Sequence, residues 1–160
     1  MPGMTLDQAK SELETVADMV TEGVYHCRSW GNPLGSRTVD ALGTLALFSR
    51  SGKARLCMHP STTDAEQQML VAISSTCADR IHLHPNKAET LLLVDGRGIH
   101  LTYDLDGTEL RRTALGHDDF TYVNTQPGIP HHVLVESEVL IFWEFIRGPF
   151  GPDSTVFIEF

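Results

Sequence analysis

The sequence predicts an all-β fold, an antiparallel jelly-roll barrel with an N-terminal α-helix in front of it. Short apolar segments separated by glycine, proline and polar turns follow one another along most of the chain, as they do in β-sandwiches and barrels. Only a stretch near the N-terminus repeats its apolar residues with a helical period. Strands do not alternate with helices, so a parallel sheet is not expected. We expect a helical extension over 1–23 and a single barrel domain over 24–160.

The composition of the chain argues against several classes of binding partner. The 160 residues are enough for one domain with a sizeable core, and 41% of them are apolar. The 12 basic and 21 acidic residues give a net charge of −9, which argues against binding to nucleic acid or to an anionic membrane. No apolar stretch is long enough to cross a bilayer. Cys27, Cys57 and Cys77 are odd in number and far apart, which is typical of reduced thiols in a cytoplasmic protein.

The predicted helix covers residues 5–20. Thr5 followed by Gln8 has the form of a capping box at its start, and Gly23 can end it. We expect the helix to pack outside the sheet or against a second subunit. Its apolar positions recur at steps of three and four residues, which is the helical period: Leu6, Ala9, Leu13, Val16 and Val20.

The strands are predicted from alternating or continuous apolar segments. Residues 24–53 have a weaker pattern and are expected to be mainly loop, with a short strand at 44–49. The run VLIFWEFI at 139–146 is the most apolar strand, and we expect it at the centre of the core. Asp106 and Gly107 join two alternating segments as a hairpin. Further strands are expected at 55–58, 69–74, 91–94, 98–105, 109–115, 120–124, 131–135 and 155–160.

Residues 82–96, HLHPNKAETLLLVDG, contain the most informative side chains. His82 and His84 lie two apart, so on a strand they point to the same face, and Glu89 begins the next apolar strand. His131 follows a glycine turn at Gly128. Buried together without a partner, these groups would cost several kcal/mol, and a divalent cation is their usual partner. We expect His82, His84 and Glu89 to bind one divalent transition metal such as Fe, Zn, Ni or Mn, with Ca and Mg disfavoured.

The spacing H-x-H-x4-E-x6-G, followed by G-x-x-H at Gly128–His131, resembles the two motifs of the cupin superfamily. Further segments resemble the WbuC-type cupins, small metalloproteins of bacterial surface-polysaccharide gene clusters. These segments are RLCMHP at 55–60, QML at 68–70, DG at 106–107 and E-x-x-RGPF at 144–150. The resemblance implies a cupin barrel in which one metal is bound by His82, His84, Glu89 and, from the second motif, His131. It also adds Arg55, His59 and Lys87 to the pocket. Leu83, Ala88 and Gln126 depart from the family pattern. These departures bear on the identity of the substrate more than on metal binding.

Other polar residues have two interpretations each. Arg80 shares the parity of His82 and either holds an anionic substrate or lies at the rim. Tyr122 either donates a hydrogen bond to a substrate or is a core tyrosine. Glu144 sits in an apolar strand and either pairs with a base such as Arg55 or belongs to the pocket. Three more histidines are expected in solvent: His100, His117 and His132.

Four functions fit these residues. The first is a metal-dependent enzyme acting on a small polar or sugar-derived molecule in polysaccharide metabolism, with Glu89 or His59 moving protons. The second is an Fe(II) dioxygenase, since four ligands of an octahedral site leave two positions open. The third is a non-catalytic sugar- or small-ligand-binding protein. The fourth, a metal-independent epimerase using Tyr122, is disfavoured by the intact ligand set. We expect a homodimer by analogy with other cupins.

Overall fold

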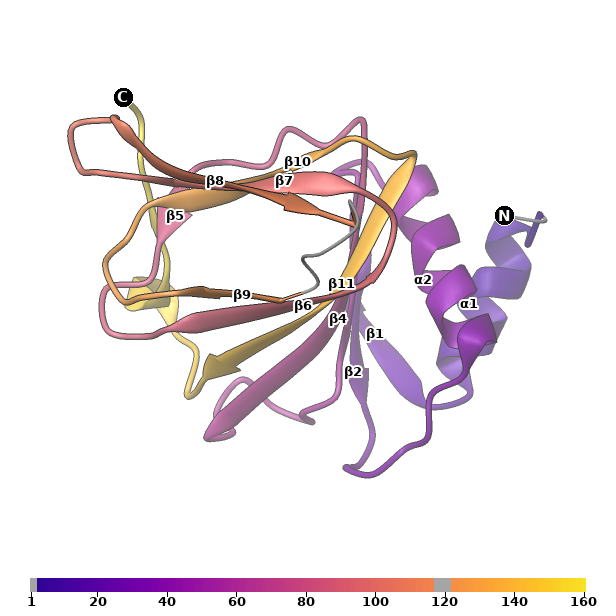
Figure 1. The fold of residues 1–160 in the computed structure, drawn as a ribbon. Helices are drawn as coiled ribbons and strands as arrows, with labels where there is room; N and C mark the ends of the chain where they lie inside the picture. The colour runs from indigo at the N-terminus through magenta and orange to yellow at the C-terminus, as the bar shows by residue number, and fades with distance from the viewer. Residues whose placement is uncertain (1–2, 117–121) are drawn as a thin grey trace.

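The computed structural model describes residues 3–116 and 122–160 and shows a mostly β protein with helices on one side (Figure 1). Its helices are α1 (Leu6–Glu14), α2 (Ser36–Phe48) and the short 3-10 helix η1 (Pro152–Ser154). Its strands are β1 (Ala17–Thr21), β2 (Val24–Cys27), β3 (Lys53–Cys57), β4 (Glu66–Ser74), β5 (His82–Leu83), β6 (Glu89–Asp95), β7 (Gly98–Tyr103), β8 (Glu109–Leu115), β9 (Tyr122–Thr125), β10 (His131–Val135), β11 (Val139–Arg147) and β12 (Val156–Phe157).

The strands form two sheets that face each other as a sandwich. One sheet has seven strands in the order β1-β2-β3-β4-β11-β6-β9, and the other has five in the order β12-β5-β10-β7-β8. From β5 onward the chain passes back and forth between the sheets, and neighbours are antiparallel except for the parallel pair β2 and β3. Within residues 3–116 and 122–160 no ladder joins the two sheets. The chain is mostly β, as expected, but it contains a second α-helix, and closure into a barrel is not detected within those ranges.

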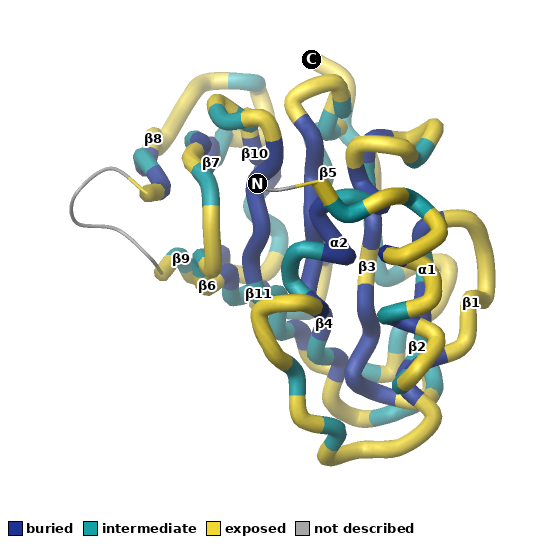
Figure 2. The backbone as a smooth tube through the Cα atoms, turned by 90° about the vertical axis from the view of Figure 1, so that its right-hand side faces the viewer, coloured by how far each residue is buried: buried dark blue, intermediate teal, exposed yellow. Residues whose placement is uncertain are grey.

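The central strand β11 divides the core into two layers, as its apolar sequence predicted. It pairs with β4 on one side and with β6 on the other. Because side chains alternate along a strand, Ile141 packs with the helices, while Leu140 and Phe142 pack between the two sheets. Glu144 has the same parity as Phe142 and faces the space between the sheets. The buried central strands lie between the helices and the second sheet in Figure 2.

The first helix begins as predicted and ends earlier. Gln8 donates its backbone N–H to the hydroxyl of Thr5, and the Thr5 backbone N–H returns a bond to the Gln8 side chain, which completes the capping box. The helix ends at Glu14 rather than at residue 20. The next residues form β1, which pairs antiparallel with β2 through a turn at Gly23 (φ +76°). Val20 is therefore a strand residue, because strand pairing outweighed the helical spacing of the apolar positions.

The second helix, α2, was not predicted, and the expected strand at 44–49 is wrong. Residues 36–48 pack against the outer face of β3, β4 and β11 (Figure 1). Thr38, Leu42 and Leu45 are buried at helical spacing, so the signal was present in the sequence. Small residues, including a buried glycine at 43, made this periodicity hard to see. None of the helices in the described part of the chain has the length and apolar character of a membrane span.

The other expected strands are found with small shifts at their ends. The hairpin at Asp106–Gly107 joins β7 and β8 as predicted. The strand expected at 120–124 is described from Tyr122 to Thr125, and its first two residues lie outside the described part of the chain. The edge strand expected at 155–160 is only β12, which pairs with β5. This pairing brings the end of the chain beside His82.

Candidate metal centre

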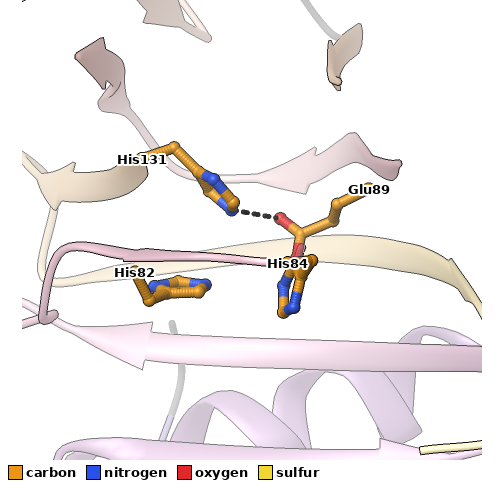
Figure 3. A group of neighbouring side chains, drawn as sticks. All are labelled: His82, His84, Glu89 and His131. Carbon is orange, nitrogen blue, oxygen red and sulfur yellow. Dashed lines mark hydrogen bonds and ion pairs between the residues drawn. The ribbon is translucent and has the colours of Figure 1, made fainter. Parts of the chain in front are cut away.

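Four side chains from three strands meet between the two sheets (Figure 3). His82 lies in β5, His84 follows it, Glu89 begins β6 and His131 begins β10. One ligand atom from each lies within 4.8 Å of the others. Nε2 of His84 is 2.9 Å from Oε2 of Glu89, and Nε2 of His131 is 3.3 Å from Oε1 of Glu89. The structure therefore brings together all four predicted ligands.

Strand pairing explains how distant segments converge. His131 is opposite His82 in the β10–β5 ladder of the five-stranded sheet, while Glu89 belongs to the seven-stranded sheet. The turn before β10 is tied to the first motif, because the backbone N–H of Gly128 donates to the carbonyl of His84 over 2.8 Å. Gly128 has φ +78°, a conformation that glycine adopts without strain. The glycine of the second motif therefore holds the two motifs together.

Each histidine of the cluster is oriented by a backbone carbonyl. Nδ1 of His82 lies 2.9 Å from the oxygen of Arg80, and Nδ1 of His131 lies 2.9 Å from the oxygen of Ile129. Nδ1 of His84 lies 2.7 Å from the oxygen of Ser154. A carbonyl only accepts, so each Nδ1 carries a proton, and Nε2 is the nitrogen that faces the centre of the cluster and offers its lone pair to a cation once it is unprotonated. This second layer of contacts is what metal-binding histidines usually have.

The charges in the cluster centre on Glu89. Burial alone would raise the pKa of this carboxyl, but the neighbouring imidazoles of His131 and His84 lower it well below its usual range. Burial opposes the charged forms of His84 and His131, yet Glu89 raises the pKa of both. Burial and the neighbouring His131 lower the pKa of His82. A negative carboxylate thus faces imidazoles within a buried site, which is an environment suited to a cation.

The residues present fit a divalent transition metal. The buried Nε2 of His131 has no hydrogen-bond partner among the described residues, since its contact with Glu89 lacks hydrogen-bond geometry. Such an orphaned nitrogen is costly unless something binds it. Three imidazole nitrogens and one carboxylate oxygen suit Fe, Zn, Ni or Mn. We assign His82, His84, Glu89 and His131 as the residues that would hold the ion.

The expectation that His100 and His132 lie in solvent is wrong. His100 is buried, and its ring stacks on that of His131 with centroids 5.8 Å apart. Burial and the neighbouring His131 lower the pKa of His100 to about 4, so it is neutral, and its Nε2 lies 3.2 Å from the hydroxyl of Thr125. His132 is half-buried, with Nε2 3.0 Å from the hydroxyl of Tyr103. His117 lies outside the described residues.

A cavity of about 510 Å³ opens in front of the cluster. Arg55, His59, Arg80 and Glu144, all predicted as site residues, line it. The guanidinium of Arg80 lies 4.1 Å from the ring centroid of Phe157, another lining residue. Arg80 is largely exposed, so it combines its two predicted positions, at the rim and within reach of a ligand.

The structure does not bring Lys87 and Tyr122 into this cavity. The ammonium of Lys87 donates to the carbonyl of Pro149 and lies 5.0 Å from the ring centroid of Phe150. Lys87 therefore supports the cavity wall from behind. Tyr122 is 57% exposed on β9, opposite Leu92 in the ladder with β6. Both interpretations of Tyr122, as substrate donor and as core residue, disagree with this position.

Glu144 is the carboxyl of the cavity that is suited to exchange a proton near neutral pH. Burial and the negative charge of Glu89 raise its pKa to about 7, although the positive charge of Arg55 opposes the rise. Within the parts of the chain that the structure describes, no ion pair joins Glu144 to Arg55. Of the two predicted roles, the structure therefore favours a place in the pocket.

Several lining residues were missed by the sequence analysis. Lys53 and Cys57 share the parity of Arg55 on β3, so alternation alone could have placed them on the cavity face. His26 reaches the cavity from β2. Asp79 forms an ion pair with Lys53 and accepts the backbone N–H of Val133 over 3.0 Å. Asp79 lies outside regular structure, and no periodic signal marks it.

Comparison with known proteins agrees with this architecture. A family model described as "Domain of unknown function (DUF6016)" matches residues 35–115, just over half of the chain. The chain belongs to this family. The matched segment includes His82, His84 and Glu89 but ends before His131. The family description names no activity, and no curated protein matches the sequence.

Solved structures with a similar fold belong to distant proteins. The capsular polysaccharide assembling protein CapF from Staphylococcus aureus has 20% identity and a TM-score of 0.55, over 64% of this chain and 31% of CapF. An oxalate oxidase in complex with the substrate analogue glycolate has 15% identity and a TM-score of 0.55, over 70% of this chain and 58% of the oxidase. A protein from Shewanella oneidensis has 9% identity and a TM-score of 0.57, over 68% and 75% of the two chains.

At these identities the similarity shows the fold alone. The predicted cupin fold is confirmed at that level by the CapF and oxalate oxidase structures. This chain spans less than a third of CapF, so it corresponds to only a part of that protein.

Proposed function

We propose that the chain is a metal-binding cupin of the WbuC type and a metal-dependent enzyme acting on a small polar, sugar-derived molecule. The observation that carries this proposal is the orientation of the three histidines. Each has its Nδ1 bound to a carbonyl and its Nε2 turned toward Glu89 at the wall of a cavity. A protein that only needed to satisfy buried histidines would not require the Nε2 atoms of all three to converge on one carboxylate.

The chain's own residues supply positioning and proton transfer. A divalent cation held by the cluster would supply Lewis acidity toward a carbonyl or hydroxyl of the bound molecule. Glu144, whose pKa is raised to about 7, is suited to give or accept a proton in the cavity. Glu89 is less suited to that role, because two histidines hold it as a carboxylate. Arg55 and Arg80 are placed to bind an anionic group of the substrate.

A sugar-derived substrate is supported by two independent similarities. CapF, which shares the fold, is a capsular polysaccharide assembling protein. The segments at 55–60 and 144–150 resemble WbuC-type cupins of surface-polysaccharide gene clusters. The cavity is also lined by hydroxyl side chains such as Thr62 and Thr155, which suit the hydroxyl groups of a sugar.

An Fe(II) dioxygenase is the second candidate. An oxalate oxidase is among the proteins with a similar fold, and the same donor set suits iron as well as zinc. Oxygen consumption by the iron-loaded protein, measured with candidate small carboxylic acids, separates this function from an isomerase or epimerase that leaves oxygen untouched.

Metal content tests the proposal most directly. In protein purified without a metal-affinity tag, His84→Ala should lose one equivalent of transition metal relative to the wild type, measured by elemental analysis. The matched control is His132→Gln, because His132 lines the same cavity but is not a member of the cluster. Equal metal content in the wild type and His84→Ala would contradict the proposal.

Turnover is the second test. Sugar nucleotides and keto sugars are candidate substrates for the metal-loaded protein. Glu144→Gln should retain its metal and lose most of its activity, whereas His84→Ala should lose both. Activity that survives complete removal of the metal would favour the metal-independent epimerase instead.

A further inference from the structure

A second group of metal-ligating side chains lines the cavity. It consists of His26 on β2, Cys57 at the end of β3 and His59 just beyond it, and one ligand atom of each lies within 4.8 Å of the others. His26 is half-buried, while Cys57 and His59 are buried. None of the three belongs to the metal centre described above. All three line the 510 Å³ cavity.

Strand pairing places this second cluster within a single sheet. His26 is opposite Cys57 in the parallel ladder of β2 and β3. His59 lies two residues beyond Cys57 on a segment that continues alongside β4, where the N–H of Met58 donates to the carbonyl of Gln68 over 2.8 Å. The rings of His26 and His59 meet edge to face, with centroids 5.3 Å apart. The cluster is therefore held by backbone pairing rather than by loop positions alone.

The histidine His26 has one nitrogen free for a ligand. Its Nδ1 lies 3.1 Å from the carbonyl oxygen of His59. Since a carbonyl only accepts, Nδ1 carries the proton and the lone pair is on Nε2. His26 is thus held in the same way as the histidines of the metal centre, by a backbone carbonyl that fixes its tautomer.

The histidine His59 has two available tautomers. Its Nδ1 lies 3.2 Å from the carbonyl oxygen and 3.1 Å from the backbone nitrogen of Gln68. With the proton on Nδ1, this nitrogen donates to the carbonyl and Nε2 keeps a free lone pair. With the proton on Nε2, Nδ1 accepts from the backbone N–H instead. A cation at Nε2 would select the first arrangement.

The thiol of Cys57 is buried and, within the part of the chain that the structure describes, carries no polar contact that would compete with a metal ion. Across the described ranges, residues 3–116 and 122–160, its sulfur forms no hydrogen bond and no disulfide. Cys57 shares a face of β3 with Arg55, where it is buried in the apolar cluster between the two sheets, beside Met69 and Val71, and also lines the cavity. Apolar packing therefore accounts for its burial, and the adjacent rings of His26 and His59 make its sulfur a potential metal ligand.

We propose that His26, Cys57 and His59 form a second cation site, which binds zinc through one sulfur and two nitrogens. Thiolate and imidazole are the usual ligands of this ion, and three protein ligands leave a fourth position open to the cavity, as in catalytic zinc sites. Hard cations such as Mg²⁺ and Ca²⁺ are disfavoured by this donor set. The proposal does not depend on the first centre, because the two clusters share no residue.

Cobalt reports on this site separately from the first one, because only a sulfur ligand gives a sulfur-to-cobalt charge-transfer absorption in the near ultraviolet. The metal-free, reduced protein is titrated with Co²⁺ and then with Zn²⁺. The wild type should bind two equivalents and develop the absorption, and Zn²⁺ should abolish it. Cys57→Ser should bind one equivalent and show no such absorption.

Two controls use residues of the same cavity. Cys77 is another free thiol that lines it, so Cys77→Ser should keep both equivalents and the full absorption. His84→Ala should lose one equivalent and keep the absorption, which distinguishes failure of the first centre from failure of the second. Circular dichroism establishes that each variant is folded. If Cys57→Ser does not fold, the half-exposed His26→Ala takes its place and should weaken cobalt binding at the sulfur site at least tenfold.

Three results would contradict the second cation site. A wild type without the charge-transfer absorption has no metal at Cys57. An absorption that persists in Cys57→Ser, or that disappears in Cys77→Ser, assigns the sulfur ligand to another thiol. Unchanged binding in a folded His26→Ala variant removes this histidine from the site.

Discussion

The two histidine clusters of the cavity differ in how they are assembled. The metal centre at His84 and Glu89 draws its residues from both sheets, and backbone carbonyls fix the tautomers of all its histidines. The cluster at His26 and Cys57 lies in one sheet, and His59 retains a choice of tautomer. The first cluster is therefore organised before a cation arrives, while the second would be completed by the cation. This difference predicts tighter binding at the first cluster.

The largest expected effect comes from Glu89→Gln. The substitution keeps the shape of the side chain and removes the negative charge that faces His84 and His131. Metal affinity at the first cluster should fall by about 100-fold or more, measured by competition with a chelator. The sulfur-to-cobalt absorption should be unaffected. Loss of both sites together would show that the two clusters are not independent.

The next effect concerns Glu144, which lies in the cavity that both clusters line. Its pKa is raised in the folded protein, to about 7, above the value of 4.5 that it has when exposed. A raised carboxyl pKa means that its contribution to stability is complete below about pH 4.5 and is lost as the pH rises through about 7. Replacing the Glu144 carboxyl should therefore raise the free energy of unfolding most in alkaline solution.

Denaturant unfolding of the metal-free protein measures this effect. Relative to the wild type, Glu144→Gln should gain on the order of 2 kcal/mol in unfolding free energy between about pH 5 and about pH 8. Glu66→Gln, an exposed position on β4, should show no such gain. A pH profile identical to that of the wild type would mean that Glu144 is ionised in the folded protein.

The smallest effect is expected from Gly128→Ala, which perturbs only the first cluster. A Cβ at this position would contact nothing, so the cost comes from φ +78° and should be about 1 kcal/mol. Because the Gly128 N–H is bonded to His84, metal affinity at this cluster should fall a few fold. Gly151→Ala is the control, since its φ of −141° suits alanine and a Cβ there would also contact nothing. Equal behaviour of the two variants would refute the role of the turn.

The sequence was sufficient to predict the residues of the first cluster and most of the strands that surround it. His82, His84 and Glu89 are close in the chain, so spacing predicted that they would meet, and the resemblance of Gly128–His131 to the second cupin motif added His131. The apolar run of β11 likewise predicted its central position. These features depend on local pattern, which a single sequence displays directly.

The remaining features depend on pairing between distant segments. His26 and Cys57 meet only because β2 lies parallel to β3, and no local signal specifies that neighbour. His100 was assigned to solvent because its hairpin is polar, yet its inward face packs against His131. The helix α2 was missed because small residues weaken its apolar period. In each case the long-range packing decided between local alternatives.

The first metal centre depends on a part of the chain that supplies no ligand, because the carbonyl of Ser154 orients one of its histidines. This oxygen comes from the 3-10 helix after β11, a segment that contributes no ligand, yet it orients the imidazole of His84. The next strand, β12, lies against His82. A protein shortened after Arg147 would retain every donor atom of this centre, but His84 would lose the carbonyl that orients its ring and His82 would lose its neighbour Phe157. The segment after Arg147 therefore stabilises the orientation of the ligands, and its removal should weaken the binding of the metal ion.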